Sequence, residues 1–242
     1  MRVTILGAGD MGTAITAPIA RNGHEINLWG THFDDHVIAA LRDGQVHPRL
    51  QYPIPAGVRP FHSVDLGASL QGTDLLILAV SSGAIDAVLD TVLAELPILP
   101  PLISLAKGLT IDEHDIVHLI SDRIQARSQA PVVVVGGPAK ANEVVMQLPT
   151  ISVFASDDAA INALATETLR TPMYEVQMTP DRIGVEIAAA MKNAYAIAVG
   201  VATGIELRSG VPHQNLKAAL FSAAVSEMAV LAETLGGSAA TV

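Results

Sequence analysis

Three glycines near the N-terminus have the spacing of a phosphate-binding turn. Gly7, Gly9 and Gly12 form G-x-G-x-x-G directly after an apolar run and directly before a helix-like stretch, a context that an ordinary glycine-rich turn does not require. Glycine at these positions permits a tight turn, close approach of a pyrophosphate and close helix–strand packing. The pattern therefore predicts a dinucleotide site formed by Gly7, Ala8, Gly9, Asp10, Met11 and Gly12.

Asp10 is unusual within this predicted turn. A carboxylate is favourable at a helix N-terminus, but it repels a nearby pyrophosphate. We therefore expect the Asp10 side chain to point away from the cofactor.

The end of the second expected strand leaves NAD and NADP both open as the cofactor. This strand, residues 25–29, is followed by Thr31 and His32, without the usual carboxylate for a ribose hydroxyl or an arginine for a 2′-phosphate. Asp34 and Asp35 lie nearby, and we interpret them as the start of the next helix. Thr31 and His32 can contact either cofactor.

Two of the four lysines occupy positions that suit proton transfer. Lys192 lies within an apolar helix-like stretch, where it either loses solvation and has a lowered pKa or extends to the surface. A desolvated lysine can exchange a proton with an alcohol or carbonyl, and Asn193 can hydrogen-bond at the same place. Lys107 and Gly137 each follow an apolar strand, at the edge where open α/β sheets bind ligands. Taken alone, a lysine at such a position is usually solvated.

The elements that must position these residues alternate between strands and helices. Apolar runs predict strands at residues 3–6, 25–29, 74–80, 102–105, 132–135, 150–154 and 174–177. Helices are expected at residues 11–21, 34–42, 84–93, 113–126 and 159–169. This alternation predicts an α/β fold with a Rossmann-type, doubly wound, mostly parallel sheet.

Only helices are expected after residue 180. We predict one at 182–204 and another at 215–235 with Asn215 as its N-cap, joined by a loop at 206–214. The expected domains are therefore a dinucleotide-binding domain, 1–180, and a helical substrate domain, 181–242. Residues 187–205 are apolar enough to raise the question of a membrane span, but Lys192, Asn193 and many small residues favour a buried helix.

The composition excludes several classes of partner. The formal net charge of −10 argues against nucleic acid and anionic membrane surfaces. The absence of cysteine excludes disulfides and thiolate metal sites, and we expect no metal site of another kind. Aromatic residues make up only 3% of the chain, so its core must be aliphatic. The N-terminus does not resemble a signal peptide, and we expect a cytoplasmic protein without membrane insertion.

Several segments resemble the NAD(P)-dependent glycerol-3-phosphate dehydrogenases. They are GAGDMGTA at 7–14, SLAKGL at 104–109, GPAKANE at 137–143 and IGVEIAAAMKNAYAIAVG at 183–200, with a weaker match in NLKAALFSAAVSEM at 215–228. The segments occur in the family's order and extend over nearly the whole chain. The Ala-Lys-Gly and Lys-Asn-x-x-Ala-Ile-Ala-x-Gly pieces are the most specific.

The resemblance implies a reaction and a role for particular residues. The reaction interconverts dihydroxyacetone phosphate and sn-glycerol 3-phosphate, with NAD or NADP as cofactor. Lys192 would be the catalytic acid/base, and Lys107 would contact substrate and cofactor. Gly137 would line the substrate site, and Ala141 would touch the cofactor.

The sequence also departs from the family's pattern. Asp10 and Met11 replace a serine and an aromatic residue, and Ala139 replaces a hydroxyl residue. The chain ends before the segments that carry an aspartate of the active site and the arginine expected to bind the substrate phosphate. We therefore expect a truncated helical domain with exposed apolar faces that favour a homo-oligomer, and cofactor binding with poor or no turnover.

Two alternatives remain open at this point. The first is a related dehydrogenase of the ketopantoate reductase or β-hydroxyacid dehydrogenase type, in which a lysine also lies on the first helix after the dinucleotide-binding domain. The second is a non-catalytic paralogue that binds the cofactor.

Overall fold

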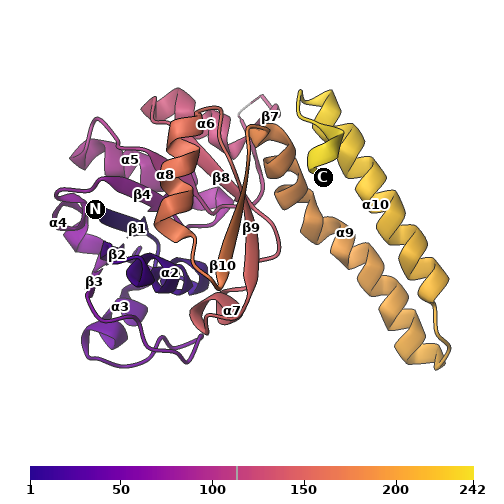
Figure 1. The fold of residues 1–242 in the computed structure, drawn as a ribbon, viewed down its shortest axis with the longest axis horizontal. Coiled ribbons are helices and arrows are strands. Elements are labelled where there is room, and N and C mark those ends of the chain that lie inside the picture. Colours follow the sequence, from indigo (N-terminus) through magenta and orange to yellow (C-terminus); the bar gives the residue numbers. More distant parts are fainter. Residues whose placement is uncertain (113) are drawn as a thin grey trace.

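A computed structural model describes residues 1–112 and 114–242 of the chain. Eight strands of this part of the chain form one sheet with the order β10-β9-β8-β5-β4-β1-β2-β3 (Figure 1). The strands are β1 (Arg2–Leu6), β2 (Glu25–Trp29), β3 (Val58–Phe61), β4 (Leu75–Leu78), β5 (Leu102–Ser104), β8 (Val132–Gly136), β9 (Thr150–Ala155) and β10 (Tyr174–Thr179). Neighbouring strands run parallel, except that β9 runs antiparallel to β8. This arrangement confirms the predicted Rossmann-type, mostly parallel sheet.

Helices cover both faces of the sheet. One face packs against α1 (Asp10–Ala14), α2 (Thr16–Arg21), α3 (Asp35–Arg42), α7 (Ala141–Val145) and α8 (Ala159–Leu169). The other face packs against α4 (Leu66–Leu70), α5 (Ile85–Glu95) and α6 (Ile120–Ser128). Within β4, Ile77 points into the first layer and Leu76 into the second, as the alternation of a strand requires. The core is predominantly aliphatic, as the composition predicted, and Phe154, Tyr174 and Trp29 are its buried aromatic residues.

The first predicted helix is divided into two. Residues 11–21 were expected to form one helix, but α1 ends at Ala14 and α2 begins at Thr16. Pro18 has no N–H with which to continue the hydrogen-bond ladder to the carbonyl of Ala14, whereas proline is tolerated in the first turn of a new helix. The hydroxyl of Thr16 donates to the carbonyl oxygen of Thr13 at 2.6 Å across this break.

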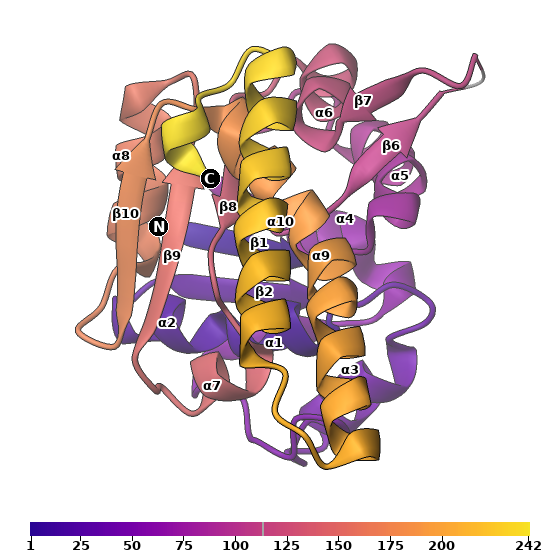
Figure 2. The ribbon, with the colours of Figure 1, turned by 90° about the vertical axis from the view of Figure 1, so that its right-hand side faces the viewer.

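The helix expected at 113–126 was wrong in its first half. Residue 113 lies outside the described residues, and residues 117–119 form strand β7 (Val117–Leu119), which pairs antiparallel with β6 (Leu109–Ile111). This hairpin extends from the main sheet (Figure 2). The helix itself begins at Ile120.

Two long helices follow the sheet and form an antiparallel hairpin beside it (Figure 2). Helix α9 spans Arg182–Ser209 and α10 spans Gln214–Thr234. The loop predicted at 206–214 is shorter than expected and spans residues 210–213, because α9 continues until Gly210 adopts a left-handed conformation with φ of 69°. The predicted N-cap is wrong, since His213 and not Asn215 precedes α10.

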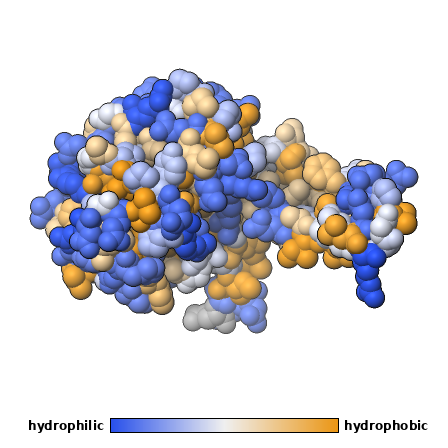
Figure 3. Space-filling view, turned by 90° about the horizontal axis from the view of Figure 1, so that it is seen from below, coloured by the Kyte–Doolittle hydropathy of each residue, from blue (hydrophilic) through white to orange (hydrophobic). Residues whose placement is uncertain are grey.

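Much of this hairpin is exposed, which contradicts the expectation of a buried helix. Only 22% of the most apolar window of α9 is buried, and Ile197 and Phe221 are 72% and 66% exposed. The hairpin forms a separate lobe with hydrophobic residues on its surface (Figure 3). By length and composition, α9 and α10 are both apolar and long enough to span a membrane. Core helices of soluble proteins share these properties, so they are weak evidence for a membrane span.

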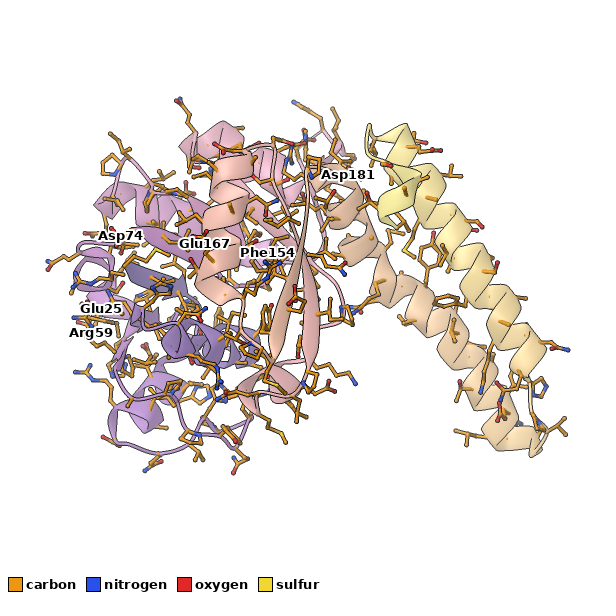
Figure 4. All side chains as sticks on the ribbon, in the orientation of Figure 1. Glu25, Arg59, Asp74, Phe154, Glu167 and Asp181 are labelled. Carbon is orange, nitrogen blue, oxygen red and sulfur yellow. The ribbon has the colours of Figure 1, made fainter. Side chains whose placement is uncertain are left out.

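The base of α9 is attached to the sheet by polar contacts. Figure 4 shows Asp181 between β10 and α9, where its carboxylate accepts from the backbone N–H groups of Gly184 at 2.9 Å and Ser238 at 3.0 Å. The next residue, Arg182, is buried and forms ion pairs with Asp122 on α6 at 2.7 Å and with Asp157 at 2.9 Å. Together these contacts fix the direction in which α9 leaves the sheet.

A buried carboxylate completes this attachment. Glu186, one turn after Arg182, is 4% exposed and accepts from the backbone N–H of Ser121 at 3.0 Å. Burial raises the pKa of the Glu186 carboxyl group. Its nearest cationic partner is Arg182, at 3.9 Å.

Replacing Arg182 with methionine should destabilise the protein strongly. The change leaves the buried Glu186 without a nearby cation, and breaking a buried ion pair in this way costs about 3 kcal/mol. Chemical denaturation would measure the loss. In the matched control Arg59→Met, which breaks an exposed ion pair with Glu25, the free energy of unfolding should fall by less than about 1 kcal/mol. Equal losses in the two variants would contradict this account of the network.

Candidate functional site

The glycine turn has the geometry that its spacing predicted. Gly7 has φ of 115°, and a Cβ atom there would lie 2.7 Å from the carbonyl oxygen of Ala79, the residue directly after β4. A Cβ atom on Gly12 would lie 2.0 Å from the carbonyl oxygen of Gly7. A Cβ atom on Gly9 would meet nothing within 4 Å. Gly7 and Gly12 therefore serve the packing of the turn, whereas Gly9 leaves space beside it.

A cavity of about 690 Å³ opens beside Gly9 at the carboxyl ends of β2 and β4. Its walls include the segment after β2, the segment after β4 and the start of α5. The lining residues include Thr31, His32, Phe33, Asp34, Ser81 and Ala87. His32 and Phe33 are exposed, and their rings lie 3.8 Å apart. Thr31 and His32, two predicted cofactor residues, thus share one cavity with Gly9.

A second cavity of about 420 Å³ continues along the same edge of the sheet. It shares Ala79, Val80 and Ser81 with the first cavity, and it is also lined by Met11 and Lys107. The two cavities lie where the strand order reverses, between β4 and β1, which is where open α/β sheets bind ligands. Their joint extent along the glycine turn suits an elongated dinucleotide with one end beside Asp34 and the other beside Lys107.

The backbone of Ala8 is held on both sides. Its N–H donates to Asp34 Oδ2 at 3.3 Å, and its carbonyl oxygen accepts from His47 Nε2 at 3.2 Å. His47 is buried, and its Nδ1 accepts from the backbone N–H groups of Arg49 and Leu50. Two accepted N–H bonds leave Nδ1 unprotonated, so the ring donates through Nε2. Asp34 and His47 together fix the orientation of the two peptide groups that flank Ala8 in the glycine turn.

Asp10 has a cationic partner in the same loop as His47. Its carboxylate pairs with Arg49 at 2.8 Å. Asp10 does not line either of the two cavities that adjoin the glycine turn. The ion pair offsets the negative charge that Asp10 would otherwise present near a pyrophosphate.

The two lysines singled out in the sequence interact with each other. Lys107 follows β5 and is partly buried, and burial lowers the pKa of its ammonium group, with a further lowering from the charge of Lys192. Lys192 itself is exposed on α9, so of the two interpretations of its position the extended side chain applies here. Asn193 is also exposed and, as the next residue on the helix, faces another direction. The desolvated lysine of the pair is therefore Lys107.

The two remaining predicted residues lie after β8. Gly137 has φ of 92°, and a Cβ atom there would lie 3.1 Å from the carbonyl oxygen of Ile151 on β9, so the backbone itself requires glycine. Ala141 is the first residue of α7, which contacts α1 directly after the glycine turn. Ala141 can therefore approach a ligand bound at that turn.

Two residues of this site escaped prediction from the sequence. Asp34 was interpreted as the start of a helix, yet its side chain turns back to Ala8. An aspartate five residues beyond β2 was a usable signal, because loops can bring it back to the strand end. His47 lies in a segment without regular structure, and no pattern in the sequence indicated it.

Comparisons with known proteins agree with this architecture. The family profile described as NAD-dependent glycerol-3-phosphate dehydrogenase N-terminus matches residues 2–162, and the corresponding C-terminus profile matches residues 181–242. The chain is 36% identical over 242 residues to the NADP(+)-dependent glycerol-3-phosphate dehydrogenase of Archaeoglobus fulgidus, covering 98% of this chain and 71% of that protein. It is also 36% identical to the glycerol-3-phosphate dehydrogenase [NAD(P)+] of Thermus thermophilus, covering 100% of this chain and 71% of that one.

A solved structure has the same fold. The crystal structure of glycerol-3-phosphate dehydrogenase from Coxiella burnetii superposes with a TM-score of 0.87 at 29% sequence identity. The match covers 99% of this chain and 71% of the other. The correspondence thus extends over the sheet and the helical hairpin.

Proposed function

Because the chain belongs to the NAD-dependent glycerol-3-phosphate dehydrogenase family, we propose that it transfers a hydride between NAD(P)H and dihydroxyacetone phosphate, forming sn-glycerol 3-phosphate, or catalyses the reverse reaction. Family membership favours this activity over that of a ketopantoate reductase or a β-hydroxyacid dehydrogenase. When bound, the cofactor supplies or accepts the hydride at its nicotinamide ring. Everything else that the reaction needs must come from the protein: orientation of the substrate, exclusion of water and movement of one proton.

The observation that carries this proposal is the lysine pair at the end of the two cavities. Lys107 lines the second cavity together with Met11, and it is close enough to Lys192 for their charges to interact. Two ammonium groups beside the glycine turn can bind a phosphorylated substrate and stand near its carbonyl oxygen. A carbonyl that accepts a hydride on carbon must accept a proton on oxygen, and a lysine ammonium can donate it.

We assign roles to the residues accordingly. Lys192 is the acid/base, Lys107 contacts both substrate and cofactor, and Asn193 can hydrogen-bond the substrate from the neighbouring side of α9. Gly137 lines the substrate site. The cofactor is contacted by the glycine turn, by Thr31 and His32 in the first cavity, and by Lys107 and Ala141 near the second. The family resemblance supports these roles. The two cavities support the proposal that one end of the cofactor lies beside Thr31 and His32 and the other end beside Lys107.

We also propose two domains that meet near residue 180. The gap between the two matched regions, 2–162 and 181–242, supports this boundary, as does the start of α9 at Arg182. The exposed apolar side chains of α9 and α10 support association of the chain with itself. A cytoplasmic location agrees with a small charged substrate and a soluble cofactor.

The activity is tested by mixing the protein with a reduced cofactor and dihydroxyacetone phosphate and recording the loss of reduced-cofactor absorbance. Dihydroxyacetone without the phosphate is the matched control, and we expect it to react at least about 100-fold more slowly, because contacts remote from the carbonyl orient the substrate. Equal rates with the two substrates would contradict the proposed substrate class.

A further inference from the structure

We propose that Asp34 makes this protein selective for NAD(H) over NADP(H). Asp34 lines the first cavity beside Gly9, at the end of the glycine turn away from Lys107. This inference rests on the proposed function, because it assigns that cavity to the adenosine half of the cofactor. It goes beyond that function by naming the residue that chooses between the two cofactors.

The position of the carboxylate suits the ribose of the adenosine. In dinucleotide-binding folds an acidic residue after the second strand accepts a hydrogen bond from the 2′-hydroxyl group of NAD. Asp34 Oδ2 accepts from the backbone N–H of Ala8 at 3.3 Å and from the N–H and hydroxyl of Thr31 at 3.0 and 2.9 Å. Oδ1 accepts no hydrogen bond from the described residues, which leaves it available to a ribose hydroxyl group.

The local structure indicates that this orientation is specific. Asp34 occupies the N-cap position of α3, where an aspartate ordinarily accepts from the N–H groups of its own helix. Here the side chain makes no such cap and turns instead to the glycine turn. A side chain that does not form the usual N-cap hydrogen bond, and instead contacts a segment beside a ligand cavity, is typical of a binding site.

The charge of the cavity disfavours a 2′-phosphate. Among the described residues that line it, Asp34 is the single carboxylate, and none is lysine or arginine. The phosphate of NADP(H) would therefore lie near a fixed negative charge without a cation to bind it.

Calorimetric titration with NADH and NADPH tests the inference. The unaltered protein should bind NADH at least about tenfold more tightly than NADPH, since like charges in a cavity weaken binding by this order or more. The preference for NADH is the Kd of NADPH divided by the Kd of NADH. In Asp34→Asn, whose amide oxygen can still accept from Ala8 and Thr31, this preference should fall by at least about tenfold, because NADPH binds more tightly. Asp34→Ser, whose short side chain is well accepted at a helix N-cap position, provides a second variant if the first is poorly folded.

The adjacent variant Asp35→Asn is the matched control. The Asp35 carboxylate accepts from the backbone N–H and the hydroxyl of Ser63, and it does not line the cavity. Removing the Asp35 carboxylate should leave the preference for NADH over NADPH unchanged. Equal or tighter binding of NADPH by the unaltered protein, or an unchanged preference in both Asp34 variants, would overturn the inference and leave the dehydrogenase function intact. Failure to bind either dinucleotide would overturn the proposed function, and the inference with it.

Discussion

Replacing Gly9 with valine should abolish dinucleotide binding and leave the folded structure in place. Gly9 has an ordinary φ of −67°, and a Cβ atom on it would meet no atom of the protein within 4 Å. The added side chain would instead project into the space beside the turn, where the backbone has to approach a pyrophosphate. Calorimetric titration with NADH should therefore show no binding, while the thermal melting curve of the free protein remains close to that of the unaltered protein.

Two other glycines make this prediction specific. Gly12→Val should destabilise the free protein, because its Cβ atom would lie 2.0 Å from the carbonyl oxygen of Gly7. Gly200→Ala adds a methyl group in open space on α9, away from both cavities, and it should leave cofactor affinity unchanged. Unchanged NADH affinity in a folded Gly9→Val protein would show that the dinucleotide does not bind at this turn.

The sheet was predictable because its strands have a simple chemical pattern. Strands β4 and β8 are buried on both faces, so their sequences are continuous aliphatic runs bounded by polar residues and glycine. Strand β3 escaped prediction because Pro60 interrupts it. A proline is tolerated there because β3 is an edge strand that pairs only with β2.

The helical hairpin shows where the sequence was misleading. The stretch around Lys192 is apolar on nearly every side, a pattern typical of burial. In the structure α10 packs along α9, but Ile197 and Val201 stay exposed. The pattern records which side chains could be buried, and it contains no information about how much of that surface a neighbouring element covers.

The part of the candidate site that is formed by backbone groups could be predicted from the sequence. The glycine turn is specified by three residues close together in the sequence, so its geometry followed directly. Asp34 was not predictable in the same way, because helix capping and a contact with Ala8 compete for one side chain. The outcome depends on a loop that brings Asp34 back to the end of β1, and local propensity does not encode that path.

Replacing Lys192 with alanine should lower turnover by ~10²–10⁴, the usual contribution of a general acid or base, with cofactor affinity nearly unchanged. Lys192→Arg should be almost as slow, because a guanidinium keeps the positive charge but does not release its proton near neutral pH. This second variant separates proton transfer from simple attraction of a phosphorylated substrate. The control is Lys217→Ala on α10, which removes an ion pair with Glu206 and should leave turnover unchanged.

The companion variant Lys107→Ala decides which lysine moves the proton. Lys107 is the partly buried member of the pair and the one whose pKa is lowered, so its ammonium group also has the properties of an acid/base. If Lys192 transfers the proton, Lys107→Ala should mainly raise the KM values for substrate and cofactor, because Lys107 lines the cavity that receives them. If instead kcat falls by ~10²–10⁴ in Lys107→Ala and is retained in Lys192→Ala, the two roles are reversed, and the partly buried lysine is the acid/base.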